Sequence, residues 1–169
     1  MSKNTNKRVA QDDQRYFTYE TEHGSIVIVS DGSCVTGVYF GKSSSFKGKN
    51  EQTVLLDNAA MQLEEYFSGK RKHFDVPISA CGTEFQRLVW ASLLEIPYGQ
   101  TRSYKYVAQS IGNPKACRAV GLANNRNPIS IIVPCHRVIG SSGALTGYGG
   151  GLDLKQKLLD LEKRHLGYV

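Results

Sequence analysis

The chain lacks several features that would place it in other protein classes. Its 169 residues contain no apolar run near the ~18 residues of a membrane span, and no signal-peptide pattern opens the sequence. A hydrophobic content of 40% suits an ordinary core, which argues against disordered, collagenous and coiled-coil chains. We therefore expect one domain or two small ones, in the cytoplasm, or in the nucleus if the source is eukaryotic.

Cysteine is sparse, and no two cysteines are spaced as a CxxC pair. The four are Cys34, Cys81, Cys117 and Cys135. In a chain of this size without a secretory signal, reduced thiols are the default and a disulfide framework is not expected. A metal site remains an alternative, although no local ligand spacing supports it. Its ligands would be His23, Cys34, His73 and Cys81.

Acidic residues are absent from one long stretch. Residues 1–81 carry ten Lys or Arg and ten Asp or Glu, whereas residues 82–169 carry eleven and five, so the whole net charge of +6 lies in the second half. Residues 96–152 contain six cations and no acid. Such a basic stretch is suited to binding a polyanion. A solvated basic face is the alternative, because six charges in 57 residues are not a dense run.

The first half has the pattern of a small sheet followed by a helix. Residues 1–15 are polar and aperiodic, which is typical of a loose leader. Short apolar segments within residues 16–40 are separated by turn residues and predict an antiparallel sheet. After a loop at 41–50, apolar residues recur at helical spacing over residues 56–67. We expect a domain over residues 16–76.

The second half, residues 82–169, is predicted to be mostly helical. Thr83 and Gln86 form a capping box, and the helix that follows has an apolar stripe. The stripe consists of Phe85, Leu88, Val89 and Leu93. Two further short helices, over residues 103–111 and 115–125, are separated by Gly112-Asn113-Pro114, which predicts a helix-turn-helix in this basic stretch. An ordinary helical hairpin has the same pattern and is the alternative. The fold class is therefore α/β in the α+β sense.

Small residues mark one face of the helix at 115–125. They are Ala119, Gly121 and Ala123. Such a face allows close approach of a backbone, as a narrow DNA minor groove requires, but packing against another helix requires it equally. Arg118 beside this face favours DNA, since a long cation fits phosphates better than a core.

Beyond Asn127 and Pro128, residues 129–133 form an apolar run of strand length, which predicts a strand buried on both sides. A loop at 140–151 holds six glycines. Asp153 and Gln156 have the spacing of a cap for a final helix. The buried stripe of that helix is predicted to contain Leu154, Leu158, Leu161 and His165, with Glu162 beside it.

The motif Pro134-Cys135-His136-Arg137 follows the apolar run. A thiol next to an imidazole and an arginine has the ingredients for a lowered pKa and a reactive thiolate. Adjacent side chains in an extended segment point to opposite faces, so we predict a turn or a bridging water between Cys135 and His136. Glu162 is the expected carboxylate partner of His136, completing a Cys-His-Glu relay. Arg137 is interpreted as a structural or electrostatic neighbour.

A Cys-His pair also occurs in cysteine proteases and acyl transferases, but those have no need of an acid-free basic segment upstream. The wider sequence resembles the O6-alkylguanine-DNA alkyltransferases from about residue 16 to the end. The resemblance rests on Pro134-Cys135-His136-Arg137-Val138 together with four flanking motifs. These are Phe85-x-x-x-Val89-Trp90, Ile96-Pro97-Tyr98-Gly99-x-Thr101-x-Ser103-Tyr104, Arg118-Ala119-Val120-Gly121 with Asn127-Pro128, and Gly147-Tyr148.

This resemblance implies a direct alkyl transfer in DNA repair. Cys135 would attack the alkyl carbon on O6 of guanine, and also on O4 of thymine, while His136 takes the thiol proton through a water and Glu162 supports His136. Tyr104 would supply a proton or hydrogen bond to the departing base. Asn127 would tie the turn between the recognition helix, at residues 115–125, and the strand that follows it. The product is a thioether that nothing regenerates, so each molecule acts once. No metal or cofactor is expected.

The resemblance also implies how DNA is held. Arg118 would fill the gap left by a flipped base while its helix enters the minor groove, and backbone groups near Val138 and Tyr148 would read that base. The expected DNA contacts are Ser103, Arg118, Ala119, Gly121, Ala123 and Arg126. Gly149 replaces a serine found in some members, which affects one hydrogen bond in the base pocket.

Further departures from the family pattern concern DNA contacts and regulation. Asn124-Asn125-Arg126 is more polar than in some relatives. The first half lacks the zinc-ligand cysteines of the larger adaptive-response regulators, so a transcriptional role through them is not suggested. A non-catalytic sensor of alkyl damage and a sequence-specific helix-turn-helix regulator remain the alternative functions. We expect a monomer on double-stranded DNA, with cooperative binding left open.

Overall fold

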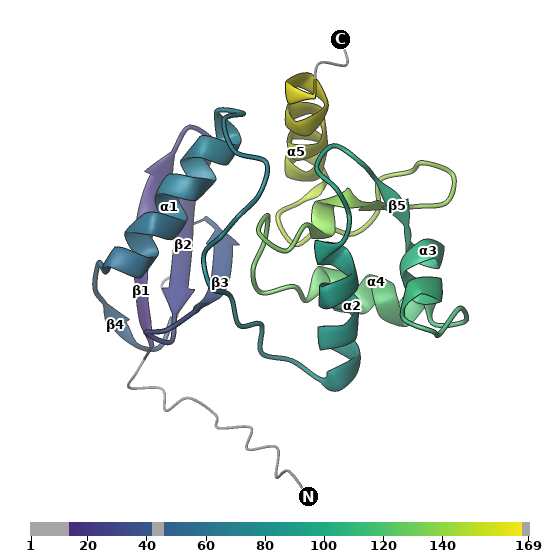
Figure 1. Cartoon of the computed structure of the whole chain (residues 1–169), viewed down its shortest axis with the longest axis horizontal. Helices are drawn as coiled ribbons and strands as arrows, with labels where there is room; N and C mark the ends of the chain where they lie inside the picture. The colour runs from purple at the N-terminus through teal and green to yellow at the C-terminus, as the bar shows by residue number, and fades with distance from the viewer. Residues whose placement is uncertain (1–13, 42–45, 167–169) are drawn as a thin grey trace, which may run out of the picture.

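The first half of the protein folds as a four-stranded sheet covered on one face by a helix (Figure 1). The computed structural model describes residues 14–41 and 46–166, so the expected leader lies outside it except for Gln14 and Arg15. Arg15 begins a strand. The strands are β1 (Arg15–Thr21), β2 (Gly24–Ser30), β3 (Val35–Phe40) and β4 (Lys49–Asn50), in the order β3-β2-β1-β4.

The predicted antiparallel sheet is confirmed for β1 to β3, whereas β4 was not predicted. β4 pairs in parallel with the start of β1. Its two polar residues carry no apolar alternation that would indicate a strand.

Helix α1 (Val54–Phe67) packs its apolar face on the sheet, as the spacing predicts. The side chain of Thr53 caps its N-terminus by accepting from the Leu56 N–H at 3.3 Å. The helix ends at Ser68, and Gly69 follows with a φ of 74°, a left-handed conformation that glycine adopts without strain.

The second half contains α2 (Glu84–Leu94), α3 (Tyr104–Ser110), α4 (Cys117–Asn125) and α5 (Leu152–His165). The capping box of Thr83 and Gln86 on α2 is confirmed. The predicted stripe is wrong at Leu88, which is 51% exposed, because Val89, Trp90 and Leu93 form the buried face. The Trp90 indole N–H donates to the Ala123 carbonyl at 2.9 Å and so joins α2 to α4.

Helices α3 and α4 form the helix-turn-helix expected from the sequence. Ser103 lies before α3 as its cap, and its hydroxyl accepts from the Tyr106 N–H at 3.1 Å. Gly112 has a φ of 74° in the connecting turn. The preceding β5 (Arg102–Ser103) pairs in parallel with β6 (Val138–Ile139), which brings the start of α3 next to the Cys135 segment.

The strand predicted over residues 129–133 is wrong. Ile131 has a φ of 71°, and Ser130 and Val133 form a bridge across the resulting turn. The apolar residues are nevertheless buried, with at most 6% exposed. These residues are apolar because the turn is buried on all sides. Periodicity cannot distinguish such a buried turn from a short strand.

The two predicted domains share one hydrophobic core, which contains residues of both halves. The edge of β3 pairs with two segments from outside the sheet. The Val38 N–H donates to the Pro128 carbonyl at 2.8 Å, and the Val35 N–H donates to the Pro77 carbonyl at 2.8 Å. This pairing covers the sheet edge and fixes the turn that leads to Cys135.

Helix α5 begins earlier than predicted, because Gly151 precedes its first residue and Asp153 lies in the first turn rather than at the cap. The predicted buried stripe is confirmed for Leu158 and Leu161 and wrong for His165, which is exposed. The buried face of α5 instead includes two charged residues, Lys155 and Glu162.

Candidate functional site

Cys135, the candidate nucleophile, lies in a one-turn 3-10 helix, η2 (Cys135–Arg137). The Arg137 N–H donates to the Pro134 carbonyl at 3.0 Å and closes this turn. In a 3-10 helix successive side chains diverge by about 120°, so Cys135 and His136 no longer point to opposite faces. The turn predicted between them is confirmed.

Asn127 holds the Cys135 segment in place. Its amide Nδ2 donates to the Val133 carbonyl at 2.8 Å and to Cys135 Sγ at 3.0 Å, while its Oδ1 accepts from the Ile129 N–H at 3.0 Å. These contacts confirm that Asn127 ties the turn. They also provide a hydrogen bond to the sulfur that favours its thiolate form.

The lowered thiol pKa predicted from the motif is wrong for the protein alone. Burial raises the pKa of Cys135 to about 11, against the opposing effects of the Asn127 hydrogen bond and the Lys155 charge. Only 3% of Cys135 is exposed, so the desolvation of a thiolate outweighs its neighbours. The thiol is therefore protonated at neutral pH, and a nucleophilic reaction needs a base.

His136 and Glu162 form the expected pair. His136 Nε2 lies 2.8 Å from Glu162 Oε1, and both side chains are fully buried. Burial lowers the pKa of His136 against the effect of Glu162. Since a carboxylate only accepts, Nε2 carries the proton and Nδ1 is left as a base. Nδ1 is buried without a hydrogen-bond partner among the residues that the structure describes.

Arg137 neutralises Glu162, which confirms its interpretation as a neighbour of the site. Its Nε lies 3.0 Å from Oε2, and its Nη2 lies 2.9 Å from Oε1. Its Nη1 donates to the Ile96 carbonyl at 2.6 Å. Burial by itself would raise the pKa of Glu162, but His136 and Arg137 together lower it to about 2. Glu162 is therefore an ionised, fixed carboxylate.

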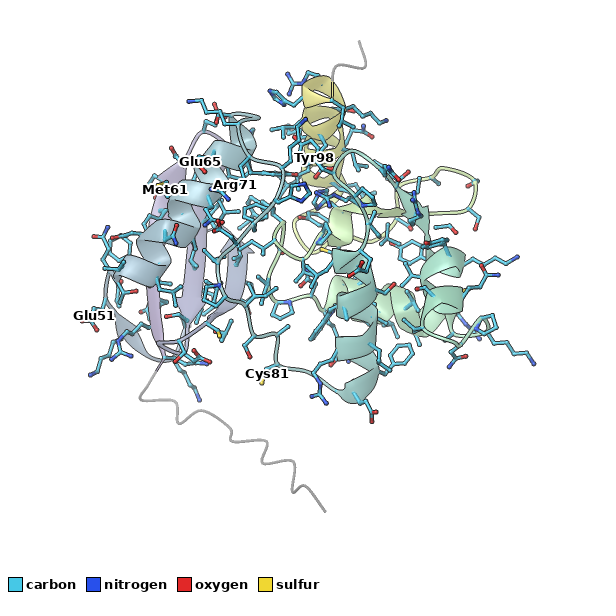
Figure 2. All side chains as sticks on the ribbon, viewed as in Figure 1. Glu51, Met61, Glu65, Arg71, Cys81 and Tyr98 are labelled. Carbon is cyan, nitrogen blue, oxygen red and sulfur yellow. The ribbon has the colours of Figure 1, made fainter. Side chains whose placement is uncertain are left out.

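Sequence reasoning missed two further donors to Glu162. The Tyr66 hydroxyl on α1 donates to Oε1 at 2.7 Å, and the Gly99 N–H donates to Oε2 at 2.7 Å. Tyr98, next to Gly99, lies at the junction between the two halves (Figure 2). Tyr66 matches the helical apolar period, so the sequence indicated only a core position. Its partner is 96 residues away, and no local pattern reveals such a contact.

Lys155 and Asn124 were also missed as neighbours of Cys135. Lys155 Nζ donates to the Val138 carbonyl at 2.5 Å and to the Thr146 carbonyl at 2.9 Å. Burial lowers the pKa of Lys155, and Cys135 opposes this shift. Asn124 Nδ2 donates to the Cys135 carbonyl at 3.2 Å, which ties α4 to η2.

A cleft of about 390 Å³ opens between α4 and the loop at 140–151. It is lined by Tyr104, Cys117, Arg118, Gly121, Asn125, Thr146 and Gly147. The Tyr104 hydroxyl donates to the Thr146 carbonyl at 2.9 Å. Gly149 is exposed, and a Cβ there would meet nothing closer than the Asn125 carbonyl at 3.8 Å. Space therefore does not exclude a serine at Gly149.

The expected DNA contacts lie mostly on the exposed side of the helix-turn-helix. Arg118, Ala119 and Arg126 are exposed, while Gly121 and Ser103 are partly exposed. The expectation for Ala123 is wrong, because this residue is 2% exposed and its carbonyl accepts from Trp90. The helical period places position 123 on the inner face of α4 with Val120.

The alternative metal site is not assembled. Among residues 14–41 and 46–166, no three His, Cys, Asp or Glu side chains lie close enough to hold a metal ion. Cys81 is on the segment that connects the two halves (Figure 2). Within the same ranges, no helix has the length and apolar character to span a membrane.

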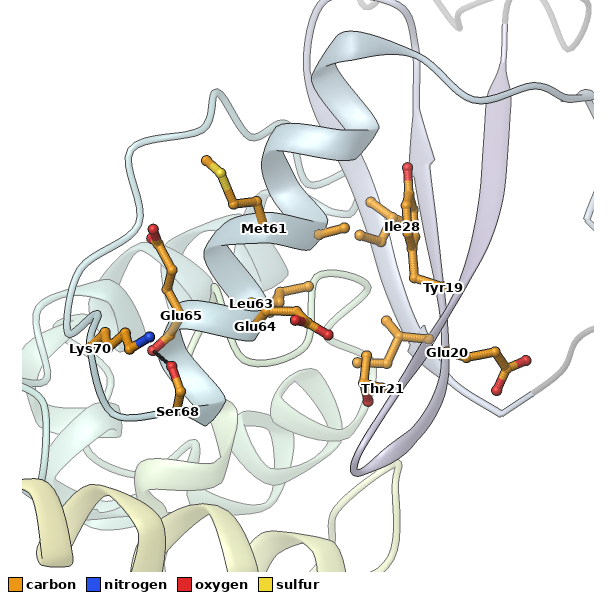
Figure 3. Close-up of a pocket in the computed structure, with 12 residues that line it drawn as sticks. Tyr19, Glu20, Thr21, Ile28, Met61, Leu63, Glu64, Glu65, Ser68 and Lys70 are labelled. Carbon is orange, nitrogen blue, oxygen red and sulfur yellow. Dashed lines mark hydrogen bonds between the residues drawn. The ribbon is translucent and has the colours of Figure 1, made fainter.

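Another cleft, of about 510 Å³, lies in the first half between α1 and β1 (Figure 3). Apolar side chains such as Ile28 and Leu63 line it together with Glu64. Its lining residues include no cysteine or histidine, and it is separate from the Cys135 site.

The fold and the site define an α+β protein with a buried cysteine and a His-Glu pair next to a basic helix-turn-helix. The DNA-binding domain of the 6-O-methylguanine DNA methyltransferases matches residues 84–164, and the ribonuclease-like domain of the same proteins matches residues 14–80. The chain belongs to the 6-O-methylguanine DNA methyltransferase family.

Individual relatives agree with this assignment. A methylated-DNA--protein-cysteine methyltransferase of Methanosarcina acetivorans is 51% identical over 156 residues, covering 87% of this chain and 97% of the relative. One of Mycobacterium leprae is 49% identical over 146 residues, covering 85% and 88%. The crystal structure of Mycobacterium tuberculosis OGT in complex with DNA superposes with a TM-score of 0.84 at 47% identity, covering 89% of this chain and 94% of that one. The predicted α+β fold is thereby confirmed.

Proposed function

We propose that this protein repairs DNA by moving an alkyl group from O6 of guanine to Cys135. The observation that carries the proposal is a buried thiol, held by Asn127 at 3.0 Å, beside a His136-Glu162 pair and an exposed basic helix-turn-helix. The names of the relatives, and the solved DNA complex of the Mycobacterium tuberculosis protein, support it.

The chemistry is a single displacement. His136 Nδ1 takes the proton of the Cys135 thiol through a water, and the sulfur attacks the alkyl carbon while the bond from that carbon to O6 breaks. The electron pair of that bond passes to the guanine. The Tyr104 hydroxyl, which donates to the Thr146 carbonyl in the protein alone, exchanges this acceptor for the departing base and supplies it with a proton or hydrogen bond. Asn127 and Lys155 stabilise charge on the sulfur as it develops. The thioether product has no route back to the thiol, so each molecule acts once.

DNA binding follows from the exposed face of the helix-turn-helix. Arg118 occupies the gap left by the flipped base, and α4 lies in the minor groove. Backbone groups near Val138, Tyr148 and Gly149 recognise the base, with O4-alkylthymine as a second substrate. The remaining DNA contacts are Ser103, Ala119, Gly121 and Arg126. The protein acts as a monomer in the cytoplasm and needs no cofactor.

Single-turnover transfer from a duplex containing O6-methylguanine tests the proposal. The wild type should gain one methyl group on the peptide that contains Cys135, and Cys135→Ser should gain none while still binding the duplex. Cys81→Ser is the matched control, because it removes an exposed thiol and should transfer normally. Binding of the lesion without a mass gain would instead indicate a damage sensor. Preference for one undamaged sequence over scrambled duplexes would indicate a regulator.

A further inference from the structure

A residue of the first half reaches into the centre of the Cys135 site. Tyr66 belongs to α1, is 0% exposed, and donates its hydroxyl to Glu162 Oε1 at 2.7 Å. The same hydroxyl oxygen lies 3.3 Å from His136 Nε2. The imidazole N–H is therefore placed between the carboxylate and the phenol.

Aromatic packing holds the Tyr66 ring in this position. Its centroid lies 5.6 Å from that of Phe74 and 5.9 Å from that of Tyr98, the latter edge to face. Such contacts leave a buried ring little freedom to turn, so its hydroxyl direction is fixed. Burial and the neighbouring carboxylate raise the pKa of Tyr66 well above its ordinary value, so the hydroxyl remains a donor.

We propose that Tyr66 is a positioning residue for the alkyl transfer, and that its hydroxyl fixes the Glu162 oxygen on which His136 rests. The inference deepens the proposed function and rests on it. The first half of the chain then completes the relay by supplying one hydrogen bond. No contact between Tyr66 and the alkylated base is required.

The hydroxyl has an electrostatic effect as well as a geometric one. Glu162 Oε1 accepts from Tyr66, His136 and Arg137, so each donor reduces the negative charge that the others experience. Without the hydroxyl, Oε1 stabilises a protonated His136 more strongly. A protonated His136 cannot take the thiol proton, so the reaction then requires a higher pH.

The other titratable groups around this pair come from several elements. Arg137 and Cys135 belong to η2, and Lys155 belongs to α5. The Arg137 guanidinium lies 5.6 Å from the ring centroid of Tyr98, with the Lys72 ammonium at 5.8 Å from that ring. None of these groups is changed by a substitution at Tyr66, so a shift in pH dependence reports on the hydroxyl.

The test is the pH profile of single-turnover methyl transfer for Tyr66→Phe, which keeps the ring and removes the hydroxyl. We expect the acid limb of the pH profile to move up by about one pH unit, which is the usual spread of a side-chain pKa between protein environments. The rate at about pH 6 should then fall about tenfold, with nearly wild-type rates on the alkaline plateau. Affinity for the duplex should not change.

Tyr19→Phe is the matched control. Tyr19 is also in the first half and donates its hydroxyl at 2.7 Å to a carboxylate on α1, that of Asp57, but it does not contact the site. This variant should keep the wild-type profile. An unmoved acid limb in Tyr66→Phe, or an equal shift in Tyr19→Phe, would overturn the proposal.

A second variant keeps the test decisive if Tyr66→Phe is too unstable to measure. Replacement of Tyr66 by 3-fluorotyrosine preserves the ring and makes the hydroxyl a stronger donor, so the acid limb should move to lower pH. An acid limb that stays at the wild-type pH in this variant contradicts the positioning role of Tyr66. Absence of any transfer by the wild type contradicts the proposed function itself, which separates the two failures.

Discussion

The buried ammonium group of Lys155 donates to the carbonyl oxygen of Val138 at 2.5 Å. Its second acceptor is the Thr146 carbonyl, so one side chain of α5 joins the segment after Cys135 to the glycine-rich loop. Both segments border the site in which we propose that the base is read. Among the residues that the structure describes, the hydrogen bonds of Lys155 include no carboxylate, and its charge favours the thiolate of Cys135.

Replacing Lys155 by Met should therefore slow the transfer about tenfold at neutral pH. Methionine keeps an apolar stem of similar length but removes both the charge and the two hydrogen bonds, so the pKa of Cys135 should rise further. Single-turnover rates measure the effect. Lys157→Met, on the exposed side of the same helix, is the control, and equal rates for the two variants would exclude this role of Lys155.

Acid should destabilise the protein through Glu162. The folded state keeps this carboxyl group ionised down to about pH 2, whereas the unfolded chain protonates it near pH 4.5. The unfolded state therefore binds the proton first, and stability falls as the pH drops from about 4.5 to about 2, by about 3 kcal/mol in total. Urea unfolding at a series of pH values measures this loss. In Glu162→Gln stability at neutral pH should be lower and this part of the acid dependence should disappear; an unchanged slope would contradict the assignment.

Cys135 should react slowly with small thiol reagents in the absence of DNA. Burial raises its thiol pKa to about 11, so only about one molecule in ten thousand carries the thiolate at pH 7. Cys81 is exposed and should be modified first. Peptide mapping after brief treatment with iodoacetamide gives the order, and preferential labelling of Cys135 would show that the protein alone activates its thiol.

Arg118→Ala should reduce transfer from duplex DNA without affecting the fold. The side chain is exposed on α4 and lines the cleft beside Tyr104, so its removal leaves the core intact. We expect a rate at least about tenfold lower, because an extruded base would return to the stack more readily. Arg87→Ala removes the same charge from the exposed side of α2 and should transfer normally. Equal losses in both variants would attribute the effect to net charge.

The sequence by itself determined the local structure and the chemical groups. Side-chain caps specify where helices begin, so Thr83 with Gln86 correctly predicted the start of α2. The sequence also correctly predicted that Glu162 pairs with His136 of the Cys135-His136 motif, since few acids are present in the second half and the resemblance names the same residue. These features depend on neighbours in the chain, or on a choice among very few candidates.

Only the tertiary structure decided how charge is balanced at the site. Tyr66 and Glu162 are 96 residues apart, and their contact exists because α1 and α5 pack on one shared core. The burial of Lys155 is also a result of tertiary structure, since a lysine in a polar helix is normally solvated and becomes buried only when loop carbonyls surround it. Burial likewise reversed the predicted pKa shift of Cys135, because desolvation depends on all surrounding atoms and not on the adjacent residues.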